Sequence, residues 1–186
     1  PPRNTSKYCL NHVMGPDEVH APVNNSGFVT GIAVWSLASA MRVSAILGVT
    51  PASSGNWSDI ANNFFLVFDE KLRYHPEFEG FKVGTVVRQA DIQLLQYPLD
   101  YVFPADVAAN DIFRYEKAIS GPAMTYGDFT VMFLQRHKDD PQNKVRAEAE
   151  FVKNYAYLYG PFSSFSECPG GGCTPQFATG MGTFLQ

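Results

Sequence analysis

Two glutamates occur where a carboxyl group can do chemistry, and Glu18 is the first. It follows a Gly-Pro turn in the string NHVMGPDEVHAPVNN, next to Asp17 and close to His20. A carboxylic acid held against apolar walls can keep a proton at neutral pH and donate it to a leaving oxygen. The ordinary alternative is that Asp17 and Glu18 are only turn and helix-start residues.

Glu167 is the only acidic residue after Glu150, and it lies among aromatic and glycine residues in the string FSSFSECPGGG. A single carboxylate on such a loop is normally just solvated. Its functional interpretation is a base that activates water. Inverting glycosidases need such a base roughly 6.5–9.5 Å from the acid, so that a water molecule fits beside the sugar.

The third candidate is the string GTVVRQADIQLL, in which Arg88, Gln89 and Asp91 are predicted to open a helix ended by Pro98. The arginine and the glutamine can hydrogen-bond sugar hydroxyls. Alternatively, the string is an ordinary first helical turn, in which Asp91 interacts favourably with the helix dipole.

Composition limits the other classes of function. The net charge is -4 and the 14 Lys and Arg residues are scattered, which argues against a nucleic-acid partner. The most apolar stretch, residues 28–47, is interrupted by Thr30 and Arg42, so no membrane span and no membrane partner are predicted. The four histidines are dispersed, so no metal site is expected.

The elements that must position these residues are mainly helices. Helix signals favour six segments, and the long apolar one is expected to be buried. The Gly- and Pro-rich stretch 160–182 is expected to be a loop held by one or two buried phenylalanines. No convincing strand alternation is present, so the prediction is an all-α domain with helices at residues 27–48, 54–68, 88–97, 104–118, 122–137 and 142–159.

Cysteines and glycosylation sequons bear on compartment. Cys168 and Cys173 bracket a Pro-Gly-Gly-Gly loop and can form a disulfide, although free thiols are an equal alternative. Asn-x-Ser/Thr sequons occur at Asn4, Asn24 and Asn56. Together they weakly favour an extracellular or vacuolar protein.

Several strings together resemble glycoside hydrolase family 65. The match lies in VMGPDEVHAPVNNSGFVT, YHPEFEGF, VVRQADIQLLQYPL, SGPAMTYGDF and PFSSFSE followed by FATGMGTFLQ, which appear in family order. The resemblance implies an inverting hydrolase that removes a terminal α-linked glucose, with Glu18 as acid and Glu167 as base. It also implies that Arg88 and Gln89 bind the substrate.

The resemblance further implies that residues 1–186 form the second half of an (α/α)6 barrel, the catalytic domain. The family's β-sandwich and C-terminal β domain are then absent, and we expect the isolated chain to be inactive. No cofactor is expected. The substrate is either trehalose or a glucosylgalactosyl unit on hydroxylysine. The alternatives to a hydrolase are a disaccharide phosphorylase of the same family and an inactive carbohydrate-binding fragment.

Overall fold

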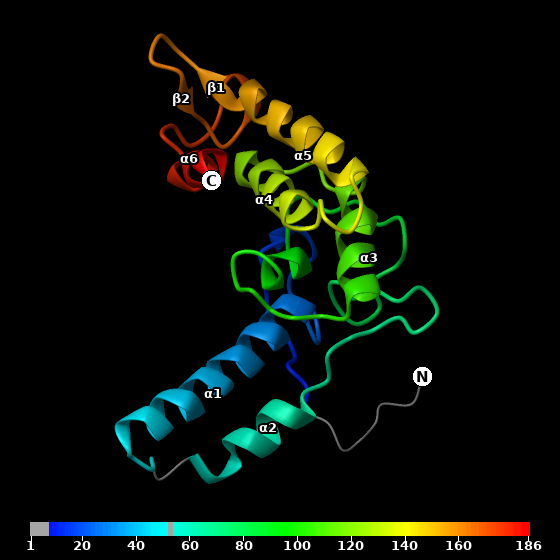
Figure 1. The fold of residues 1–186 in the computed structure, drawn as a ribbon, viewed down its shortest axis with the longest axis vertical. Coiled ribbons are helices and arrows are strands. Elements are labelled where there is room, and N and C mark those ends of the chain that lie inside the picture. The colour runs from blue at the N-terminus through cyan, green and yellow to red at the C-terminus, as the bar shows by residue number, and fades with distance from the viewer. Residues whose placement is uncertain (1–7, 52–53) are drawn as a thin grey trace. The chain divides into compact units, whose positions relative to one another are not determined.

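The computed structural model describes residues 8–51 and 54–186, and the chain divides into two compact units. Unit 1 comprises residues 1–83 and unit 2 comprises residues 84–186. Figure 1 shows that helices dominate both. The only regular strands in the described part of the chain are two short ones in unit 2. The predicted all-α class is therefore confirmed.

Unit 1 is built on helix α1 (Gly27–Leu47), which starts and stops where the sequence predicts. The Ser26 side chain caps the start by accepting a hydrogen bond from the backbone N–H of Val29, at 3.3 Å. Gly48 ends the helix with a φ of 64°, a conformation that costs glycine little because it has no Cβ. Serine and glycine signals thus fix both ends of the helix.

The prediction that α1 is buried is wrong. Only its first residues are buried, and Trp35, Val43 and Ile46 are among the exposed large hydrophobic side chains. In the described part of unit 1 the helix that packs along α1 is α2 (Trp57–Asn63) (Figure 1), and several large apolar side chains of α1 stay exposed. By length and composition alone α1 is apolar enough to cross a membrane.

Helix α2 (Trp57–Asn63) follows a single 3-10 turn and is shorter than predicted. It ends because Phe64 is extended and pairs in parallel with Tyr8. The Tyr8 backbone N–H bonds to the Asn63 carbonyl at 2.7 Å, and the Phe65 N–H bonds to the Tyr8 carbonyl at 2.8 Å. Residues 64–83 then continue without helix.

Unit 2 begins with the segment predicted as a helix from residue 88, and that prediction is wrong. Only the 3-10 turn Ile92–Leu95 forms there. The residues just before this turn make other hydrogen bonds than helical ones, because Val87 pairs with Ile119 and the Ala90 N–H bonds to the Thr125 hydroxyl. Tertiary hydrogen bonds replace the helical ones.

Three helices that the sequence predicts form the centre of unit 2: α3 (Ala105–Glu116), α4 (Ala123–Gln135) and α5 (Gln142–Lys153). Pro104 and Pro122 directly precede the first two, as predicted from their fixed φ. Helix α4 packs against α5 and the C-terminal helix α6 (Ala178–Leu185) (Figure 1). The core of the unit is its buried apolar side chains, which include Ile92, Leu95, Val107, Ile112, Tyr115, Phe129, Met132 and Phe133.

The C-terminal part of unit 2 is more ordered than the predicted loop. After the 3-10 turn Asn154–Tyr157, strands β1 (Leu158–Tyr159) and β2 (Ser164–Phe165) form a small antiparallel hairpin. The 3-10 turn Pro169–Gly171 and helix α6 (Ala178–Leu185) follow. Phe165 is buried as expected, but the helix was missed, because its string ATGMGTFL contains two glycines.

Cys168 and Cys173 form a disulfide, with their Cα atoms 5.3 Å apart, whereas Cys9 is in no disulfide. Of the three sequons, Asn56 is exposed, Asn24 is half-buried and Asn4 lies outside the described residues. The oxygen of the Asn24 side chain accepts a hydrogen bond from the backbone of His12 at 3.1 Å. Asn24 therefore has a structural role in unit 1.

Candidate active site

Glu18 lies at the tip of a closed loop in unit 1. The backbones of Val13 and Val23 exchange two hydrogen bonds of 2.9 Å and close the base of the loop. The tip is a 3-10 turn of Glu18–His20, and the Asp17 carboxylate accepts a hydrogen bond from the backbone of Val19 at 3.2 Å. Asp17 is buried while Glu18 is exposed. Asp17 therefore shapes the turn and leaves the Glu18 carboxyl open to a ligand.

The structure brings the Glu18 loop together with the segment YHPEFEGF. The Gly27 N–H bonds to the Glu77 carbonyl at 2.7 Å, and the side chain of Asn25 donates to the Glu79 carboxylate at 2.9 Å. The His20 ring lies 5.5 Å from the Phe78 ring, measured between centroids. Two motifs more than 50 residues apart in the sequence thus form one surface in unit 1.

Buried side chains in the described part of unit 1 are mostly polar. The larger apolar exceptions are Tyr74 and Pro76. Buried polar groups cost free energy unless they are hydrogen-bonded, so a concentration of them is typical of a binding site rather than of a core. The polar set is Asp17, Asn25, Ser26, Thr30, His75 and Glu77.

Arg88 and Gln89 lie on an extended segment of unit 2. Hydrogen bonds of 3.3 Å join Val87 to the backbone of residues 118 and 120, and the Ala90 N–H bonds to the Thr125 hydroxyl at 3.2 Å. Val87 and Ala90 are buried, Gln89 is half-buried and Arg88 is exposed. The buried residues on either side fix the backbone on which Arg88 and Gln89 stand.

Glu167 is held at the start of helix α4. Its carbonyl accepts a hydrogen bond from the Ala123 N–H at 3.4 Å, and its own N–H donates to the Thr174 carbonyl at 3.1 Å. The Thr174 hydroxyl also donates to the Glu167 carboxylate, with Oγ1 2.8 Å from Oε2. Because Ala123 and Thr125 are neighbours in α4, Glu167 and the Arg88-Gln89 segment are anchored at the same end of that helix.

The four predicted site residues therefore fall into two groups. Glu18 belongs to unit 1, whereas Arg88, Gln89 and Glu167 belong to unit 2. Unit 1 supplies a candidate proton donor, Glu18, together with a set of buried polar side chains. Unit 2 supplies a candidate base, and an arginine and a glutamine that can bind hydroxyls stand on a segment anchored at the same end of α4.

The sequence did not single out Asp128, a carboxyl on α4 that is only 4% exposed. Burial raises its pKa from 3.8 to about 7. It sits one turn after Thr125, and its charge contributes, after burial, to the raised pKa of Tyr97. An acid in a string as apolar as MTYGDFTVMF is the signal that could have marked it.

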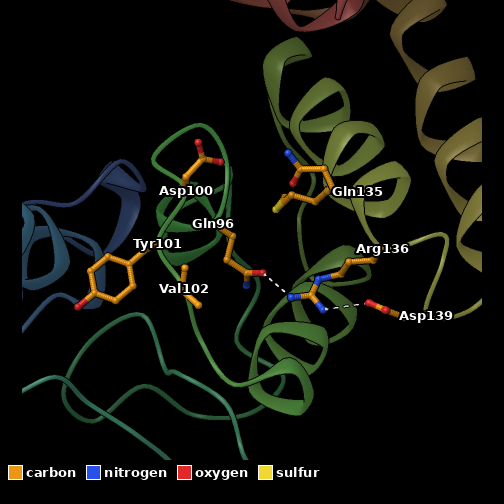
Figure 2. A pocket seen from close by; sticks show the side chains of 8 residues that line it. Gln96, Asp100, Tyr101, Val102, Gln135, Arg136 and Asp139 are labelled. Carbon is orange, nitrogen blue, oxygen red and sulfur yellow. Dashed lines mark hydrogen bonds and ion pairs between the residues drawn. The ribbon is translucent and has the colours of Figure 1, made fainter.

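A cavity of about 360 Å³ opens at the opposite end of α4 from Glu167. Figure 2 shows Arg136 between Gln96, whose Oε1 lies 3.4 Å from the guanidinium, and Asp139, at 3.9 Å. A helix of 13 residues is about 20 Å long, so this cavity is separate from the Glu167 site. Its lining comprises Gln96, Asp100, Tyr101, Val102, Met132, Gln135, Arg136 and Asp139.

Comparisons with known proteins agree with these motifs. The model of the glycosyl hydrolase family 65 central catalytic domain matches residues 2–84, which include Glu18 and α1. A protein-glucosylgalactosylhydroxylysine glucosidase of Danio rerio is 36% identical over 97% of the chain. A cell wall acid trehalase of Arthroderma benhamiae is 27% identical over 89% of the chain.

The chain covers 27% of the Danio rerio protein and 16% of the trehalase, so it spans about a quarter or less of these relatives. Among solved structures, a putative kojibiose phosphorylase from the human microbiome superposes with a TM-score of 0.58 at 12% identity. That match covers 85% of this chain and 31% of the phosphorylase. The likeness shows the fold and confirms the predicted class, part of an (α/α)6 barrel. By these comparisons the chain is similar to members of glycoside hydrolase family 65, and its residues 2–84 match the model of that family's central catalytic domain.

Proposed function

We propose that the protein is an inverting glycoside hydrolase that releases a terminal α-linked glucose. One observation carries the proposal: Glu167 has its carboxylate held by Thr174 and is anchored at the same end of α4 as Arg88 and Gln89. A phosphorylase needs no protein base, because phosphate itself is the nucleophile. A glutamate held at the same end of α4 as side chains that can bind hydroxyls is the group that hydrolysis requires.

In the proposed reaction the Glu167 carboxylate takes a proton from water while the water oxygen bonds to the anomeric carbon. The glycosidic C–O bond breaks with its electrons going to the leaving oxygen, which takes the proton of Glu18. One water is consumed, and glucose and the free alcohol are formed. Solvent then exchanges protons with both carboxyls. Attack on the face opposite the leaving group gives β-glucose.

We further propose a glucosylgalactosyl unit on hydroxylysine as the substrate, with trehalose second. The support is the higher identity to the relative named for the first substrate, 36% against 27%. In either case Arg88 and Gln89 bind glucose hydroxyls and no cofactor takes part. A small carbohydrate, free or attached to hydroxylysine, is thus the partner that we propose.

We also propose that residues 1–186 are the second half of the barrel and that the family's β domains lie elsewhere in the enzyme. The exposed apolar side of α1 supports this, because Ile46 is 74% exposed and Trp35 is 45% exposed. Exposed apolar area of this kind is typical of a surface covered by another part of the protein. Such a chain is inactive by itself.

The test expresses the open reading frame that encodes the chain, beside the 186-residue chain alone. Glu18→Gln and Glu167→Gln are each expected to lower kcat about 10²–10⁴-fold. Glu148→Gln is the matched control, because Glu148 is exposed on α5. Arg88→Lys and Gln89→Ala are expected to raise KM.

Phosphate separates the classes of activity. Glucose release that does not need phosphate supports the hydrolase. Release that requires phosphate and survives Glu167→Gln would instead identify a phosphorylase. Sugar binding without turnover by the longer protein would identify a carbohydrate-binding fragment.

A further inference from the structure

We infer that Thr174 is a positioning residue for Glu167, and that the Cys168–Cys173 disulfide keeps the two together. The inference rests on the proposed function, which assigns Glu167 as the base. It adds a residue on the other side of a loop and a covalent bond that makes activity sensitive to reduction.

The first support is the double contact between the two residues. Their backbones are joined by the hydrogen bond from the Glu167 N–H to the Thr174 carbonyl, at 3.1 Å. Their side chains are joined by the hydrogen bond from the Thr174 hydroxyl to Glu167 Oε2, at 2.8 Å. A backbone bond fixes where the glutamate starts, and the side-chain bond fixes one of its two oxygens. The second oxygen stays available to accept a proton from water.

The second support is the short ladder that aligns these residues. Ser166 and Pro175 form an antiparallel bridge, and the Phe177 N–H bonds to the Phe165 carbonyl at 2.9 Å. Phe165 is buried, so this end of the ladder is anchored in unit 2. The other end leads through Glu167 and Thr174 into a glycine-rich loop.

The disulfide closes the ladder at that open end. Cys168 follows Glu167, and Cys173 precedes Thr174, so the bond joins the residues directly beyond the pair. Gly171 in the loop lies against the Tyr159 ring, where a Cβ would come within 2.6 Å of a ring carbon. The loop is therefore cross-linked by the disulfide and packed against Tyr159 of β1.

Reduction would remove the cross-link that holds the half-buried Glu167 next to the exposed Thr174. Dithiothreitol supplies the two electrons: it becomes a cyclic disulfide, and Cys168 and Cys173 become two thiols. The loop then has more conformations, and the fraction of molecules with Glu167 correctly placed falls. The expected loss is in kcat, because the chemical step needs the base while substrate binding does not.

The side-chain test compares Thr174→Val with Thr174→Ser. Valine keeps the shape and removes the donor, and we expect it to lower kcat about tenfold with KM unchanged within about twofold. Serine keeps the hydroxyl and is expected to restore kcat to within about twofold. A valine variant with wild-type kcat, or a serine variant as impaired as the valine one, would overturn the role of Thr174.

The disulfide test uses a Cys9→Ser background, which removes the cysteine that is not part of the Cys168–Cys173 disulfide. Dithiothreitol is expected to lower kcat about tenfold in that background and to have no effect after Cys168→Ser and Cys173→Ser. Adding Thr174→Val to the cysteine pair is expected to lower kcat no further, because both changes free the same carboxylate. Full activity after reduction, or additive losses, would contradict the inference.

Glu167→Gln separates this inference from the proposed function. If Glu167→Gln retains turnover, the assignment of the base fails and the Thr174 results have no bearing on catalysis. If Glu167→Gln abolishes turnover and Thr174→Val does not change kcat, the base stands and the positioning role is wrong.

Discussion

Asp128 makes the stability of the protein fall as pH rises. It is almost fully buried, and its pKa is raised by that burial from 3.8 to about 7. Between these two values the folded protein keeps the proton that the unfolded chain has lost, so each pH unit costs the folded state about 1.4 kcal/mol. The stabilising effect is complete below pH 3.8 and lost above about pH 7.

The perturbation that exposes this effect is Asp128→Asn, which keeps the shape of the side chain and removes the titration. The full shift of about three units corresponds to about 4 kcal/mol. Because pH 5 lies about one unit above the pKa of the unfolded chain, that part of the loss in stability has already occurred there. The free energy of unfolding of Asp128→Asn, relative to that of the wild type, should therefore rise by about 3 kcal/mol between about pH 5 and about pH 8.

Urea unfolding followed by helical circular dichroism at the two pH values measures the difference. Asp139→Asn is the control, because the Asp139 side chain is 69% exposed on the same unit. It should change with pH as the wild type does. If the gap between Asp128→Asn and the wild type is the same at both pH values, the argument from burial is refuted.

Two further predictions concern the packing of α4. Gly127→Ala should lower the free energy of unfolding by about 1–3 kcal/mol, because the new Cβ would overlap the Cβ of Thr183. Thermal unfolding with and without Thr183→Gly checks this, and no recovery in the double variant would contradict it. Thr125→Val should cost about 1–3 kcal/mol by leaving the buried Ala90 N–H unpaired, while Thr125→Ser should cost less; equal losses would count against the hydrogen bond.

Local signals predicted the helices well and tertiary hydrogen bonding poorly. Pro104, Pro122, Ser26 and Gly48 mark ends that the structure confirms, because caps and fixed φ values act within a few residues. The predicted helix from residue 88 failed, because the Ala90 N–H bonds to the Thr125 hydroxyl, and Val87, just before the segment, pairs with the neighbours of Ile119. Partners 30 or more residues away leave no local signal.

The candidate site shows the same division. Motif resemblance selected Glu18, Arg88, Gln89 and Glu167, and the structure anchors the last three at one end of α4. Motif resemblance could not select Thr174, because a threonine after a cysteine is not a distinctive pattern. Only the folded structure shows that its hydroxyl bonds to the Glu167 carboxylate. The burial of α1 was predicted wrongly, because composition reports how apolar a helix is and not what covers it.

We propose that Glu18 and Glu167 catalyse hydrolysis with inversion. Proton NMR of the anomeric signals during the first minutes of reaction tests it most directly, with glucosylgalactosyl hydroxylysine and trehalose as substrates, without phosphate, and with Glu18→Gln and Glu167→Gln beside the wild type. The wild type is expected to release β-glucose as its first product, and neither variant is expected to release a detectable amount in that time. α-Glucose as the first product, or β-glucose from Glu167→Gln at the wild-type rate, would contradict it.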